Sequence, residues 1–105
     1  MVVMSKIILK FLWSDKTIGV CLDQKIGPDS LNPLTEYFFW PQRDAWEDIK
    51  NFIEKSSWID QREAIILLNR LTDVINFWQD NSNMENKGIS FLNSKFPDCF
   101  FILRN

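Results

Sequence analysis

The chain contains no histidine, only three glycines and only two cysteines. Without histidine the commonest general base and metal ligand is missing, and pairs of a serine or cysteine nucleophile with histidine are excluded. The isolated glycines form no glycine-rich phosphate loop, and two distant cysteines cannot supply the ligands of a zinc site. We therefore expect no catalytic residues, no cofactor and no metal, and predict that the protein is not an enzyme.

An excess of basic residues and long apolar segments are missing as well. The 105 residues carry a net charge of −2, which counts against a dedicated nucleic-acid binder but leaves room for a local basic patch. The longest apolar runs, residues 65–68 and 99–103, are much shorter than the ~18 residues of a membrane span. We expect no membrane partner and no small-molecule substrate. Cys21 and Cys99 are too far apart to indicate a metal or redox motif.

Alternating apolar residues predict a small sheet in the first part of the chain. The alternation over residues 6–13 and 18–24, on either side of a short polar turn, predicts an antiparallel hairpin. Residues 27–33 have the composition of a loop. The aromatic run at 35–40 predicts a third strand, which ends at Pro41.

Two helix-start signals follow the strands. Asp44 and Glu47 stand three residues apart, as in a capping box, and Asp60 and Glu63 repeat the pattern. Apolar residues recur at spacings of three and four after each signal, so residues 44–80 predict two antiparallel helices joined by a short link. The first helix is expected to end near Ser56 and Ser57.

The remaining residues are less regular. Residues 81–88 are a polar break, and the tail at 89–105 favours either an edge strand at 99–103 or a short helix near 91–95. Together these patterns predict an α+β fold. A three-stranded antiparallel sheet, made of the N-terminal hairpin plus one aromatic strand, packs on the helix pair. Residues 1–80 form the single domain and 81–105 a C-terminal extension.

Carboxylates gather on the first turn of the first predicted helix, at Asp44, Glu47 and Asp48. Such a cluster could be a hard-cation site or an acid/base pair. Acidic side chains also belong at a helix N-terminus for a structural reason, because they oppose the positive end of the helix dipole. We favour the structural interpretation.

The aromatic run places rings on both faces of its strand. Tyr37 and Phe39 share one face, and Phe38 and Trp40 share the other. Two helices cover only one face of a three-stranded sheet, so either the C-terminal segment covers the second face or rings are left for a partner. A partner could be a protein, which aromatic and arginine side chains bind well, or unpaired RNA bases that stack on the rings. Ordinary core packing is the third interpretation.

Three segments of the chain, 10–24, 33–50 and 58–80, resemble the plastid-specific 30S ribosomal protein 3 family of chloroplasts and cyanobacteria. The most specific part is the string PLTEYFFWP followed by the helix start DAWE, and INFWQD at the end of the second helix adds to it. The resemblance covers roughly residues 7–80, in the same order and with similar gaps. Residues 81–105 have no counterpart in it.

The resemblance implies a structural constituent of the chloroplast-type small ribosomal subunit with no catalytic role in translation. The implied partners are small-subunit rRNA and neighbouring small-subunit ribosomal proteins, in the plastid stroma or in a cyanobacterial cytoplasm. The first residues lack the features of a transit peptide, which under the resemblance fits a plastid-encoded, mature or cyanobacterial form. The alternative is a protein-interaction or regulatory module that associates transiently with the ribosome or another complex.

The candidate contact residues are cations near the hairpin turn or the strand-to-helix corner, together with the rings beside them. They are Lys10, Lys16 and Arg43 for phosphate, and Tyr37, Phe38 and Trp40 for packing or stacking. Solvated charge and ordinary core are the competing interpretations for each of them. Because the chain is acidic overall, we expect few phosphate contacts and a shallow dependence of binding on salt.

Overall fold

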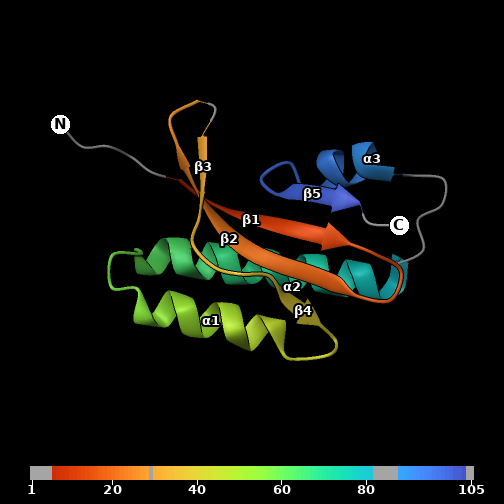
Figure 1. The fold of residues 1–105 in the computed structure, drawn as a ribbon, viewed down its shortest axis with the longest axis horizontal. Helices are drawn as coiled ribbons and strands as arrows, with labels where there is room; N and C mark the ends of the chain where they lie inside the picture. Colours follow the sequence, from red (N-terminus) through yellow and green to blue (C-terminus); the bar gives the residue numbers. More distant parts are fainter. Residues whose placement is uncertain (1–5, 29, 82–87, 104–105) are drawn as a thin grey trace.

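The computed structural model describes residues 6–28, 30–81 and 88–103, which form five strands and three helices. In chain order these are β1 (Lys6–Trp13), β2 (Ile18–Ile26), β3 (Ser30–Pro33), β4 (Phe38–Trp40), α1 (Ala45–Lys55), α2 (Gln61–Asn81), α3 (Gly88–Lys95) and β5 (Phe100–Leu103). Helices α1 and α2 lie together on one side of the β1–β2 hairpin (Figure 1). None of the helices in this described part of the chain is long and apolar enough to cross a bilayer.

The predicted N-terminal hairpin is confirmed. Strands β1 and β2 pair antiparallel from Lys6 opposite Lys25 to Trp13 opposite Ile18. The Ser14 backbone N–H donates to the Thr17 carbonyl across 3.1 Å and closes the turn. The alternating apolar side chains of both strands face α1 and α2 and form the buried core, as predicted: Ile7, Leu9, Phe11, Trp13, Ile18, Val20 and Leu22.

The sheet is larger than predicted and is not purely antiparallel. Its strand order is β3-β2-β1-β5, with β4 paired to β2 beside β3, and the whole sheet is strongly curled (Figure 1). Strand β5 runs parallel to β1, from Lys10 opposite Phe100 to Trp13 opposite Leu103. The α+β class and the helix pair are therefore right, whereas the three-stranded antiparallel sheet is wrong.

Part of the predicted loop at 27–33 is a strand. β2 continues to Ile26, two residues past its predicted end, and β3 pairs with this extra length. Gly27 adopts a φ of +73°, a left-handed conformation that glycine accepts without strain and that turns the chain back towards β2. All four side chains of β3 are exposed, so its sequence carries no alternating pattern that could have revealed it.

The predicted aromatic strand is shorter than residues 35–40. Only Phe38–Trp40 form β4, which pairs with the start of β2. Before it, the Leu22 N–H donates to the Thr35 hydroxyl across 3.0 Å, and the Leu22 carbonyl accepts the Leu34 N–H across 2.8 Å. A side chain thus replaces one ladder hydrogen bond here, and the chain passes from β3 to β4 along the same edge of β2.

Both helices begin and end as their signals predict. The Asp44 carboxylate accepts the Glu47 N–H across 3.0 Å and caps α1, which ends at Lys55. The Asp60 carboxylate accepts the Arg62 N–H across 3.2 Å before α2. The predicted helix pair is therefore confirmed, and Asp44 has the structural role that we favoured, as the cap of α1. Most of the predicted polar break at 81–88 lies outside the described residues.

Both alternatives for the tail occur, one after the other. Residues 88–95 form α3 and residues 100–103 form β5. The Phe101 ring stacks on the Phe11 ring with 5.4 Å between centroids, and Leu92 and Phe96 are also buried. The described part of the tail thus contributes to the same core as the first part of the chain. The domain boundary at residue 80 stays a prediction.

Candidate interaction surface

One face of the sheet is turned away from α1 and α2, and we call it the open face. It carries the even-numbered residues of β1 and their cross-strand partners. At its centre Lys10 Nζ lies 2.8 Å from Asp23 Oδ2, and only 1% of the Asp23 side chain is exposed. The Cys21 thiol donates to the other Asp23 oxygen across 3.8 Å. The hydrogen bond to Asp23 raises the pKa of Lys10 above its ordinary value.

The aromatic rings divide between the two faces as predicted. Tyr37 and Phe39 lie on the open face with 6.3 Å between their centroids, and Lys10 Nζ lies 5.9 Å from the Tyr37 ring centre. Phe38 and Trp40 turn to the other face, where they are half-buried against the core. Of the three rings predicted for contact, only Tyr37 therefore lies on the open face.

The two other predicted cations lie near the hairpin turn and the strand-to-helix corner. Arg43 is exposed, but its guanidinium donates to the Asp48 carboxylate across 2.6 and 3.0 Å and lies 5.6 Å from the Phe38 ring centre. Lys16 is exposed at the turn between β1 and β2. Its neighbour Thr17 lines the same surface hollow as Arg43. The six predicted residues thus form two groups and not a single cluster. Lys10 and Tyr37 lie at the centre of the open face, and the others lie around the hairpin turn and the strand-to-helix corner.

Sequence reasoning missed a third place, at the far end of the open face. There Lys6 and Lys25 stand directly opposite each other in the β1–β2 register. Phe100 of β5, which is 51% exposed, lines the same hollow as Lys25. The signal is visible only once β3 and β5 are placed in the sheet, because residues of four strands meet here.

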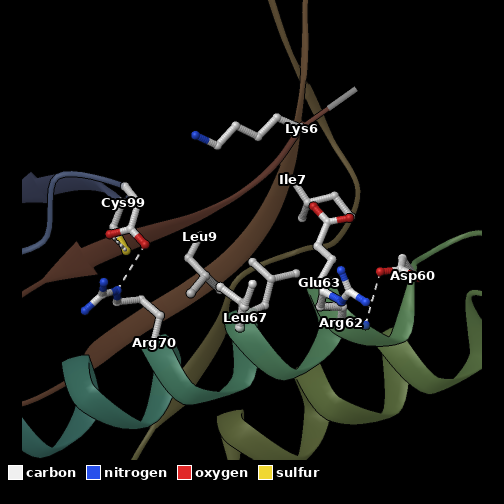
Figure 2. A pocket seen from close by; sticks show the side chains of 11 residues that line it. Lys6, Ile7, Leu9, Asp60, Arg62, Glu63, Leu67, Arg70 and Cys99 are labelled. Carbon is white, nitrogen blue, oxygen red and sulfur yellow. Dashed lines mark hydrogen bonds and ion pairs between the residues drawn. The ribbon is translucent and has the colours of Figure 1, made fainter. Parts of the chain in front are cut away.

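A separate groove runs between the start of α2 and the first half of β1 (Figure 2). Its floor is apolar and consists of side chains that belong to the core, namely Ile7, Leu9 and Leu67. At one end Arg70 Nε lies 3.0 Å from Asp98 Oδ2, and Figure 2 shows Arg70 pointing towards the segment that carries Cys99. Most of this groove is therefore core, with the Arg70–Asp98 ion pair at one end.

The two thiols are poor nucleophiles. Burial raises the pKa of Cys21 to about 11 and that of Cys99 to about 12. The thiolate is the reactive form of cysteine, so both side chains stay protonated near neutral pH. Within residues 6–28, 30–81 and 88–103, no three side chains of the metal-binding types are grouped closely enough to hold a metal ion.

The buried thiols make the fold sensitive to alkali. Between an ordinary pKa of 9.0 and the raised values, each thiol is ionised in the unfolded chain and protonated in the folded one. Their contribution to stability is complete below pH 9 and is lost as the pH rises, at up to about 1.4 kcal/mol per pH unit for each thiol. We expect urea unfolding to show a lower free energy at about pH 10 than at about pH 8, and a smaller difference for Cys99→Ala. An equal difference in the two chains would contradict this.

These observations define a class of protein. The described residues form a small α+β domain with one open sheet face that bears rings and cations, and with thiols held in their unreactive form.

Comparison with known proteins identifies the family. Residues 34–81 match the model of the plastid and cyanobacterial ribosomal protein family (PSRP-3 / Ycf65). The small ribosomal subunit protein cS23 of Euglena mutabilis is 60% identical over 95% of this chain and 99% of its own length. That of Gracilaria tenuistipitata var. liui is 42% identical over 97% of this chain and 100% of its own length. The chain belongs to the PSRP-3 / Ycf65 family, which confirms the resemblance seen in the sequence.

The alignments also bear on the tail. The alignments with the Euglena mutabilis and Gracilaria proteins leave out at most about a twentieth of this chain. Each alignment therefore includes most of residues 81–105. The cS23 protein of Mesostigma viride is 44% identical over 93% of this chain. The tail therefore has a counterpart in these relatives, although our sequence analysis found none.

Proposed function

We infer that the chain is a structural constituent of the small ribosomal subunit of plastids, with no catalytic role. The observation that carries this is its 60% identity with a small ribosomal subunit protein over nearly the whole length of both chains. Membership of a ribosomal protein family supports a role in translation. The described structure agrees with that role, since its thiols are unreactive and the Asp44 carboxylate caps α1.

We further propose that the chain contacts both rRNA and neighbouring ribosomal proteins. Lys16 is the strongest phosphate contact among the predicted cations, because Lys10 and Arg43 already have carboxylate partners. Those two can reach phosphate only by sharing their charge with Asp23 and Asp48.

The predicted rings suit different partners. Tyr37 on the open face is placed to pack or stack against a partner that covers this face. Phe38 and Trp40 lie against the core with part of each ring exposed, so a partner would touch only their edges. These two rings therefore suit a protein neighbour at the strand-to-helix corner better than a stacked base.

Sedimentation tests the proposed function. We expect the chain to sediment with plastid small ribosomal subunits in a sucrose gradient and to stay with them through a high-salt wash, because a structural constituent is held by many contacts at once. A transient regulatory module, the alternative function, would sediment with the subunits at low salt and wash off at high salt. Recovery of the chain only at the top of the gradient, before any wash, would contradict both.

A further inference from the structure

The open face has a hollow at the end farthest from the β1–β2 turn, which we call the β3–β5 hollow. It measures about 340 Å³. Residues from four strands and the β2–β3 turn line it, namely Ile8, Lys25, Pro28, Ser30, Leu31 and Phe100. Phe100 and Leu31 are both exposed there although they are large and apolar. The hollow therefore offers an aromatic ring and aliphatic surface to a flat apolar group.

One cation, Lys25, lines this hollow, and a second, Lys6, stands opposite it on β1. Lys6 and Lys25 are cross-strand partners, so their side chains leave the sheet on the same face, and both are exposed. Like charges directly opposite each other destabilise a sheet. Among the described residues neither lysine forms an ion pair, whereas Lys10 on the same face is neutralised by Asp23. An anion bound between Lys6 and Lys25 would relieve their repulsion.

The acidic side chains of the molecule are concentrated elsewhere. Between residues 44 and 81, which form the helix pair and its link, acidic residues outnumber basic ones. The acidic residues are Asp44, Glu47, Asp48, Glu54, Asp60, Glu63, Asp73 and Asp80, and the basic ones are Lys50, Lys55, Arg62 and Arg70. The helix pair lies on the opposite side of the sheet from the open face (Figure 1). A polyanion would therefore approach the open face.

We propose that the β3–β5 hollow binds a single-stranded segment of rRNA. An unpaired base stacks on the exposed Phe100 ring, and the adjacent phosphates lie on Lys6 and Lys25. Stacking on aromatic side chains and neutralisation of phosphate by lysine are the two contacts by which single strands bind proteins. An apolar protein segment would fill the hollow but would leave the two ammonium groups unneutralised, so the charges favour RNA. This inference rests on the proposed function, since it assigns a site to one of the partners named there.

A photocrosslink tests which partner covers the hollow. The chain is prepared with p-benzoylphenylalanine in place of Phe100, added to plastid small subunits lacking the native protein, and irradiated. The control carries the same group in place of Trp58, which is 54% exposed in the link between α1 and α2. We expect a crosslink to rRNA from position 100 and none from position 58. Crosslinks from position 100 to protein alone would overturn the inference but leave the proposed function standing. Failure of the unmodified chain to join the subunits would overturn both.

The dependence of binding on salt tests the lysines separately. The probe is a short oligouridine, because stacking on a ring tolerates any base. Changing Lys6→Gln and Lys25→Gln together should reduce the slope of log K against log salt by about 0.7 for each lysine that contacts a phosphate of a single strand. The matched control changes two lysines of α1, Lys50→Gln and Lys55→Gln, and should keep the parent slope. An unchanged slope for the Lys6/Lys25 chain, or no binding of oligouridine by the parent, would overturn the inference.

Discussion

Replacing Phe101 by alanine is expected to lower the free energy of unfolding of the isolated chain by about 3–5 kcal/mol. Phe101 is only 5% exposed. Its ring centre lies 5.4 Å from that of Phe11, 6.1 Å from that of Trp13 and 6.0 Å from that of Phe96. The substitution leaves a cavity at the point where β5 and the end of α3 join the main core. For a domain of this size the loss is a large share of the total stability.

The adjacent residue provides the matched control. Phe100 lies on the opposite face of β5 and is 51% exposed, so Phe100→Ala should change the free energy of unfolding by no more than about 0.5 kcal/mol. Urea unfolding followed by tryptophan fluorescence at neutral pH measures both chains. Equal stability of the two variants would mean that β5 does not pack on β1 as the structure describes.

The elements that could be predicted are those whose signals lie within the element itself. The alternation in β1 reports burial of one face, and the Asp44 cap reports a local hydrogen bond to the backbone three residues on. Both signals can be recognised from neighbouring residues in the sequence, without knowledge of any tertiary contact. The same holds for the apolar stripe of α2, of which Leu67, Leu71 and Val74 are buried as expected.

The elements that were missed depend on partners elsewhere in the chain. Strand β3 exists because the end of β2 offers it backbone hydrogen bonds, and its own exposed side chains carry no pattern. The apolar residues of β5 predict a possible strand there. They do not predict its parallel pairing with β1, which lies near the other end of the chain. Sequence patterns do not encode which distant strand a segment will join, because backbone pairing is the same for every sequence.

The candidate site was harder to predict than the fold for the same reason. The cross-strand pair of Lys6 and Lys25 exists only in the register of the hairpin, and Phe100 reaches it only because β5 lies beside β1. Lys10 shows how the fold changes the surroundings of a predicted contact residue. In the sequence it is a cation in a strand, available to phosphate, whereas in the fold it lies diagonally across from Asp23 on the neighbouring strand and forms an internal ion pair.

That ion pair leads to the second large effect. Replacing Lys10 by methionine is expected to lower the free energy of unfolding by about 3 kcal/mol, because it removes one partner of a buried ion pair and leaves Asp23 without its cation. The value is at the low end for a buried pair, since the Lys10 side chain is 22% exposed and water can reach that position. This loss of unfolding free energy is expected at neutral pH. Pairing raises the pKa of Lys10 above 10.5, so the contribution is complete below that pH and is lost as the pH rises through the raised value.

The same substitution at Lys25 separates loss of the ion pair from loss of a surface lysine. Lys25 lies on the same face but is exposed and forms no ion pair within the described residues, so Lys25→Met should stay within about 0.5 kcal/mol of the parent. Combining Lys10→Met with Asp23→Leu should restore most of the loss, because a buried ion pair exchanged for apolar side chains is often neutral. Urea unfolding of the parent, Lys10→Met, Asp23→Leu and the double variant gives the coupling energy between the two residues, and Lys25→Met is measured beside them. If Lys10→Met proves as mild as Lys25→Met, Asp23 is hydrated in solution, and Lys10 is then free to bind phosphate as its sequence position suggested.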